Sequence, residues 1–171
     1  MDGLVIDASV LIDFVASDVR LLALIAQHVA PVVIPLPVLG EVDGLDESTA
    51  LALGLTVAET TLDHMREAAD RARTLSFVDY LCLLTARDLR LVCVTNDSAL
   101  LTACRNQGVA TMRGLRPLIH LVQAGVITPR GSLAVVRTIR EGNAYITPTV
   151  VRAYVTEIRV IARSRWSSRL E

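Results

Sequence analysis

The chain has 171 residues, of which 52% are hydrophobic, 20% charged and 4% aromatic, and its formal net charge is −1. This composition predicts one folded domain with an aliphatic core and excludes a disordered chain. All basic residues are arginines, and the absence of lysine excludes P-loop NTPases, Schiff-base enzymes and receiver-type phosphoacceptor domains.

The first third of the chain alternates short apolar runs with helical patterns. Leu4–Ile6 ends at Asp7, and Val32–Ile34 lies between prolines. Both runs predict buried strands because they are short and rich in β-branched residues. Pro37 suits the first turn of a short helix, which we expect to carry Glu41. The other elements expected here are helices at Ser9–Val15, Val19–His28 and Ser48–Leu53, and a strand at Thr56–Ala58.

An amphipathic helix is expected from Thr61 to Arg73. Glu67 and Arg71 form a favourable i,i+4 pair on one of its faces. A second face gathers apolar residues, which we expect to be buried: Leu62, Met65, Ala69 and Ala72.

The middle of the chain continues the alternation. Ser76 predicts the N-cap of an apolar helix that runs to about Leu89, and Leu91–Val94 is the clearest strand. A helix at Ser98–Gln107 and a short edge strand at Val109–Thr111 follow. Strands that alternate with helices predict an α/β fold with a mostly parallel sheet covered on both faces.

From Arg113 onward the pattern is helical only, and we expect a basic C-terminal extension (residues 113–171) packed on the preceding domain (residues 1–112). Residues 1–112 carry 15 acidic and 7 basic side chains, whereas residues 113–171 carry 3 and 10. The last expected helix opens at Thr147-Pro148 and places arginines in one stripe: Arg152, Arg159 and Arg163. Three roles stay open for this stripe: contact with RNA phosphate, contact with an acidic partner, or a solvated face.

One uncharged stretch, between Arg20 and Glu41, is long enough to be checked as a membrane span. It contains Pro31, Pro35 and Pro37, which a continuous apolar helix does not accommodate. The chain starts without the basic region of a secretory signal, and its cysteines are expected to be core residues in a reducing compartment. We therefore expect a cytoplasmic protein that makes no membrane contact.

Four carboxylates stand in apolar surroundings or directly after strands: Asp7, Glu41, Asp79 and Asp97. Each also has an ordinary explanation, as a helix cap or as a solvated side chain. Asp7 and Asp97 follow predicted parallel strands, so we expect them to lie close together at one edge of the sheet. Carboxylates that converge repel one another unless a cation is bound, and oxygen ligands alone favour Mg²⁺ or Mn²⁺.

Four segments resemble, in order and spacing, the signature of PIN domains. They are Val5-Ile6-Asp7-Ala8-Ser9, Glu41 on an early helix, Ser76-Phe77-Val78-Asp79, and Leu91-Val92-Cys93-Val94-Thr95-Asn96-Asp97. The resemblance covers roughly residues 3–112 and identifies the chain as an extended member with a C-terminal helical tail, similar to VapC-like toxin ribonucleases.

The resemblance implies a three-layer α/β/α fold and a metal-dependent endoribonuclease, often the toxin of a toxin–antitoxin pair. Asp7, Glu41, Asp79 and Asp97 would then be the catalytic ligands of one or two Mg²⁺ or Mn²⁺ ions. Ser9, together with Thr95 or Asn96, would orient those carboxylates. RNA would be the substrate, and an antitoxin protein and a second copy of the chain would be the partners.

Two other functional interpretations apply to the same residues. Many PIN domains carry a further acid shortly after the position of Asp97, whereas Ser98–Leu101 contains none, so a PIN-like module that binds RNA or protein without turnover stays the alternative. A haloacid-dehalogenase-type phosphatase would need a second acid where Ser9 stands and a lysine that the chain lacks, and it is rejected.

Overall fold

The computed structural model describes residues 1–71 and 75–167. Its centre is a sheet of five parallel strands in the order β3-β2-β1-β4-β5. The strands are β1 (Leu4–Ile6), β2 (Val32–Pro35), β3 (Thr56–Ala58), β4 (Val92–Val94) and β5 (Thr111–Met112). The three residues of β1 are fully buried, as expected for the central strand of a sheet covered on both faces. The predicted parallel α/β fold is confirmed.

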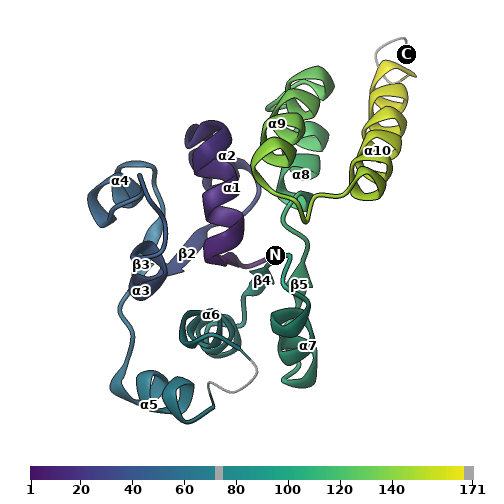
Figure 1. Ribbon diagram of the computed structural model, residues 1–171. Helices are drawn as coiled ribbons and strands as arrows, with labels where there is room; N and C mark the ends of the chain where they lie inside the picture. Colours follow the sequence, from purple (N-terminus) through teal and green to yellow (C-terminus); the bar gives the residue numbers. More distant parts are fainter. Residues whose placement is uncertain (72–74, 168–171) are drawn as a thin grey trace.

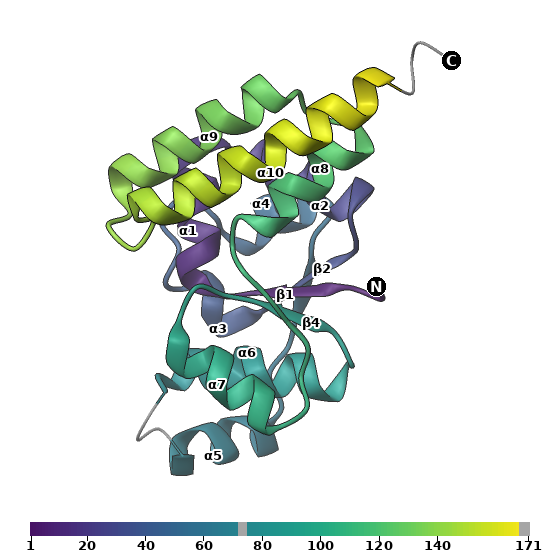
Figure 2. The same cartoon turned by 90° about the vertical axis from the view of Figure 1, so that its right-hand side faces the viewer.

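Helices form the two outer layers (Figures 1 and 2). On one side of the sheet lie α6 (Phe77–Asp88) and α7 (Ser98–Asn106), with α5 (Leu62–Arg71) outside α6. On the other side lie α1 (Ala8–Asp18), α2 (Arg20–His28), α8 (Arg116–Ala124), α9 (Pro129–Gly142) and α10 (Pro148–Ser167). Two short helices, α3 (Leu36–Leu39) and α4 (Glu47–Ala52), connect β2 to β3. The architecture is a three-layer α/β/α fold.

The C-terminal helices share the core of the rest of the chain. Helix α9 packs on α1, and α8 packs on α2. Their buried residues, such as Leu118 and Ile139, belong to the same hydrophobic cluster as β1. A side-chain contact adds to this packing, because the amide of Asn143 donates to both carboxylate oxygens of the buried Asp13 on α1, at 3.0 and 3.0 Å. The division at residues 112 and 113 stays a prediction.

Two local predictions need correction. The helix after Pro37 ends at Leu39, so Glu41 lies in the turn behind it rather than on the helix. On α5 the apolar face is exposed instead of buried, with Leu62 70% and Met65 39% accessible. Ala72, predicted on this apolar face, and Arg73, the predicted end of the helix, lie outside the described residues.

The inward face of α5 combines the buried Ala68 with polar side chains that pair with α6. His64 contacts Asp88 at 2.7 Å, and Arg87 contacts Glu67 at 3.4 Å. The predicted pair of Glu67 with Arg71 is present at 3.5 Å. Polar pairing with α6 therefore sets the orientation of α5, against its apolar pattern.

Other expectations concern the cysteines and the membrane. Cys82, Cys93 and Cys104 are buried and free, as predicted for core residues. Among the helices that the structure describes, none combines the length and apolar character that a membrane span requires.

We predict that Gly114→Ala destabilises the fold. A Cβ at Gly114 would lie 2.7 Å from both the Asn96 amide nitrogen and the Val10 Cγ2 atom, closer than any relaxed contact. Such overpacking costs about 1–3 kcal/mol. Urea unfolding followed by circular dichroism measures the loss.

Gly142→Ala is the matched control, because nothing lies within 4 Å of a Cβ at that exposed position in α9. Its free energy of unfolding is expected to be unchanged or slightly higher, since alanine favours a helix. Equal unfolding midpoints for the two variants would contradict the close approach at Gly114.

Candidate functional site

Asp7 is a buried carboxylate at the carboxyl end of β1. Its residue is 2% exposed, and it caps α1 by accepting a hydrogen bond from the Val10 amide at 2.8 Å. The Ser9 hydroxyl donates to its two oxygens, at 3.0 and 3.1 Å. The Thr95 hydroxyl, from the end of the neighbouring strand β4, donates to Oδ2. Asp7 is therefore held by both strand ends and by the first turn of α1.

The charge of Asp7 is not neutralised by a basic side chain. Burial raises the pKa of Asp7 from 3.8 to about 6, the charge of Asp79 adds to the rise, and the hydrogen bonds from Thr95, Val10 and Ser9 oppose it. Within the described part of the chain, no ion pair includes Asp7. A buried carboxylate in this state is stabilised by a bound cation.

Thr95 connects Asp7 to Asp97. The register of β1 and β4 sets Ile6 opposite Val94, which places the following residues of both strands side by side. The fully buried Thr95 hydroxyl donates to Asp7 and accepts from the backbone amide of Asp97 at 2.9 Å. Asp97 is exposed, and its side chain caps α7 by accepting from the Leu100 amide at 2.7 Å. The structure thus links the Asp7 carboxylate to the backbone of Asp97 through Thr95.

Asp79 lies in the first turn of α6, the helix that packs against β1. It forms a capping box with Ser76. The Ser76 hydroxyl donates to Asp79 Oδ2 at 2.7 Å and accepts from the Asp79 amide at 3.0 Å. Capping occupies only part of this carboxylate, since a carboxylate has lone pairs for further ligands.

Glu41 is exposed, in the turn after α3, and its amide donates to the Val38 carbonyl at 3.1 Å. A buried thiol shows where Glu41 lies relative to the other acids. Burial raises the pKa of Cys82 most, and the charges of Asp7, Asp79 and Glu41 raise it further. These three carboxylates therefore all lie close enough to act on the same buried thiol.

The acids do not form a closed ligand cage. Within the residues that the structure describes, no three side chains of Asp, Glu, His or Cys are placed to hold one metal ion together. The donor chemistry does fit a hard divalent cation, because all four groups are carboxylates and Asp7 lacks a counter-charge.

Asn96 contacts the backbone rather than an acid. Its Oδ1 atom accepts from the Gly114 amide at 3.0 Å, which fixes the chain between β5 and α8 beside the end of β4. Its buried amide nitrogen has no hydrogen-bond partner among the described residues. Of the three predicted orienting residues, Ser9 and Thr95 contact Asp7 directly and Asn96 holds Gly114.

Arg113 is a site residue that the sequence reasoning missed. It is exposed, and its guanidinium donates to the Asn96 carbonyl at 3.0 Å, one residue before Asp97. It comes directly after β5, as Asp7 comes directly after β1. The rule that pointed to the strand-end acids could therefore have found this cation too.

Asn143 and Tyr145, from the connection between α9 and α10, complete a small cavity beside Asp97. The cavity has a volume of about 240 Å³, and its other walls come from the ends of the β1–α1 and β4–α7 connections: Ser9, Asn96, Asp97 and Ser98. Sequence patterns gave no signal for this approach, because it depends on how the C-terminal helices pack.

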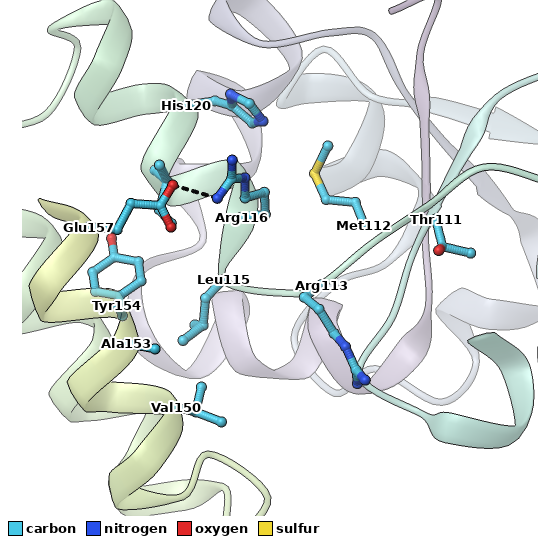
Figure 3. Close-up of a pocket in the computed structure, with 11 residues that line it drawn as sticks. Thr111, Met112, Arg113, Leu115, Arg116, His120, Val150, Ala153, Tyr154 and Glu157 are labelled. Atoms are coloured by element: carbon cyan, nitrogen blue, oxygen red, sulfur yellow. Dashed lines mark hydrogen bonds and ion pairs between the residues drawn. The ribbon is translucent and has the colours of Figure 1, made fainter. Parts of the chain in front are cut away.

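A second cavity, of about 560 Å³, lies between β5, α8 and α10 (Figure 3). Arg116 and Glu157 form an ion pair in its wall, and Arg113 points away from that pair. Helix α10 faces this cavity with Val150, Ala153, Tyr154 and Glu157. The predicted arginine stripe lies at other, exposed positions of α10, namely Arg152, Arg159 and Arg163, so its role stays a prediction.

Comparisons with known proteins bear on the fold. No protein-family model matches the chain, and neither does any curated protein. Among solved structures, a PilT N-terminus domain protein from the hyperthermophilic archaeon Sulfolobus solfataricus is similar, with a TM-score of 0.52 and 17% sequence identity. The match covers 68% of this chain and 90% of the archaeal one. The chain therefore has the fold of a PilT N-terminus, or PIN, domain.

Proposed function

We propose that the chain is a metal-dependent endoribonuclease. The observation that carries this proposal is Asp7: a buried carboxylate at the carboxyl end of a central parallel strand, with its pKa raised to about 6 and no basic side chain to neutralise it. The PIN-like fold supports the assignment, because PIN domains are generally nucleases.

Asp7 and Asp79 are the acids best placed to hold Mg²⁺ or Mn²⁺, since the charge of one acts on the pKa of the other. Asp97 is joined to Asp7 through Thr95, and the charge of Glu41 acts on the same buried thiol, Cys82, as the charges of Asp7 and Asp79. A divalent ion at this place would lower the pKa of a bound water and offset charge on the phosphodiester.

The remaining chemistry belongs to side chains of the protein. Ser9 and Thr95 hold the Asp7 carboxylate in one orientation, so it is presented without a loss of rotamer freedom on binding. Arg113, exposed beside the Asn96 carbonyl, supplies a positive charge for an RNA phosphate. RNA as the substrate, a toxin role with an antitoxin partner, a homodimer and a cytoplasmic location complete the proposal, and they rest on the family resemblance.

The alternative is a PIN-like module that binds RNA or protein without turnover. The arrangement of α7 favours it, because Ser98 and Ala99, in the first turn after Asp97, are exposed and carry no acid. Binding without cleavage in the experiment below would support this alternative.

The first prediction under this proposal concerns cleavage. The wild type is expected to cut a mixed single-stranded RNA pool with Mg²⁺ or Mn²⁺ and to stop in EDTA. Asp7→Asn and Asp97→Asn should each lower the rate by about 100-fold or more, because a neutral amide is a much weaker ligand. Gel electrophoresis of end-labelled RNA measures the rate.

Asp46→Asn is the matched control for both variants. Asp46 caps α4 by accepting from the Thr49 amide at 2.7 Å, as Asp7 and Asp97 cap their own helices, but it lies in the connection between β2 and β3. Asparagine is also a good cap, so each variant keeps its helix. Full activity in Asp7→Asn and Asp97→Asn would leave capping as the only role of these acids.

A second prediction concerns stability without metal. The folded pKa of Asp7, about 6, lies above its ordinary value of 3.8. The folded state therefore binds this proton more tightly, and the free energy of unfolding falls as the pH rises from about 4 to about 6. Asp7→Asn removes this loss, so at pH 7.5 in EDTA it should be more stable than the wild type by roughly 3 kcal/mol.

Thermal unfolding between pH 4 and 8, with and without Mn²⁺, tests this expectation. Mn²⁺ should raise the melting temperature of the wild type by several degrees and leave Asp7→Asn nearly unchanged, since a ligand stabilises the state that binds it. Parallel pH profiles for the two proteins would show that the charge of Asp7 carries no penalty in the fold.

A further inference from the structure

The cavity beside Asp97 has walls from two distant parts of the chain. Ser9, Asn96, Asp97 and Ser98 form one side, and Asn143 and Tyr145 form the other. Figure 2 shows the connection between α9 and α10 on the same side of the molecule as the starts of α1 and α7. The C-terminal helices thus contribute directly to the surroundings of the proposed site.

The connection between α9 and α10 is held in place by specific contacts. The side chain of Asn143 binds Asp13 through its amide nitrogen and accepts from the Tyr145 amide, at 2.9 Å, through its oxygen. Ile146 is 3% exposed, and its amide donates to the Asn143 carbonyl at 3.1 Å. Asn143, two residues before Tyr145, and Ile146, directly after it, are therefore held in place, and the Tyr145 amide itself is hydrogen-bonded.

The Tyr145 side chain itself is exposed to solvent. It is 85% exposed, in a chain where Tyr80 and Tyr154 are buried at 8% and 4%. A large ring in water costs free energy that packing would recover, yet Ile146, next to it, is the residue that is buried. A rigid backbone that presents an exposed ring at a cavity is an arrangement suited to a flat ligand.

The cavity has the size and chemistry for one nucleobase. An apolar cavity of about 150 Å³ accepts benzene, and this one measures about 240 Å³. Ser98 in its wall is exposed and offers a hydroxyl that can donate to or accept from a base edge. Arg113 adds a positive charge at the neighbouring Asn96 carbonyl, where a backbone phosphate would follow.

We infer that Tyr145 is a stacking surface for one unpaired nucleobase next to the bond that is cut. This inference rests on the proposed nuclease function and adds a substrate-positioning residue to the same site. A base inside a duplex is already stacked on both faces and cannot be offered to the tyrosine ring, whereas an unpaired base can.

The test measures binding separately from cleavage. Fluorescence anisotropy of a labelled 12-nucleotide single-stranded RNA in EDTA compares the wild type with Tyr145→Ala, Tyr145→Phe and Tyr145→Trp. Loss of base stacking is expected to weaken binding about 10- to 100-fold in Tyr145→Ala. The phenylalanine and tryptophan variants should stay within about threefold of the wild type, because the ring and not the hydroxyl makes the contact.

Leu62→Ala is the surface control, because Leu62 is 70% exposed on α5, on the opposite side of the sheet from α9 and α10. It should bind RNA as the wild type does. A series of RNAs with one abasic position each adds a double-mutant cycle. At the stacked position, removal of the base should weaken binding to the wild type and have no further effect on Tyr145→Ala.

The outcomes separate this inference from the proposed function. Single-stranded RNA that binds through Tyr145 but is never cut would support the stacking surface and overturn the nuclease. RNA cleavage with unchanged binding in Tyr145→Ala, or an equal loss in Tyr145→Phe, would overturn the stacking surface and keep the nuclease. The stacking surface is also overturned if the wild type binds duplex RNA as tightly as single-stranded RNA. A wild type that binds no RNA overturns it too, and would indicate that Tyr145 contacts a protein instead.

Discussion

The parallel pairing of β1 with β4 is the constraint on which the rest of the structure depends. Because Ile6 lies opposite Val94, the next residues of the two strands, Asp7 and Thr95, meet at one edge of the sheet. Two helices also begin there, and their caps are Asp7 and Asp97. A shift of one residue would replace Thr95 and leave the most buried acid without its hydroxyl donor. Fold and site are thus specified by the same few backbone hydrogen bonds.

Much of the fold could be predicted because parallel sheets leave a strong local pattern. The short β-branched runs at Leu4–Ile6 and Leu91–Val94 correspond to β1 and β4, and Ser76 caps α6 as its spacing indicates. The meeting of Asp7 with the Asp97 region followed from topology alone. Helix α5 shows the limit of such reasoning. Its apolar stripe predicts one buried face, but ion pairs formed with α6 orient the helix, and a partner 20 or more residues away leaves no local trace.

The candidate site was predictable only in part, for a related reason. Acids that directly follow strands can be recognised in the sequence, because the apolar pattern of the strand marks where it ends. Tyr145 does not follow a strand, and its position depends on the packing of α9 against α1. Glu41 falls between these cases, since its place in a turn near α6 depends on where α3 ends. Short-range patterns therefore identified the chemistry of the site, whereas the groups that would select a substrate come from long-range packing.

The hydrogen bonds between Asn143 and Asp13 have a consequence for synthesis of the chain. They join residues 130 positions apart, and they fix the connection that presents Tyr145. A ribosome synthesises the chain from its N-terminus, so β1, β4 and their acids are made before α9. The wall of the cavity that carries Tyr145 forms only afterwards. A nascent chain would thus carry its acids before it could bind a strand of RNA, and the complete site would form only after α9 and the connection behind it are made.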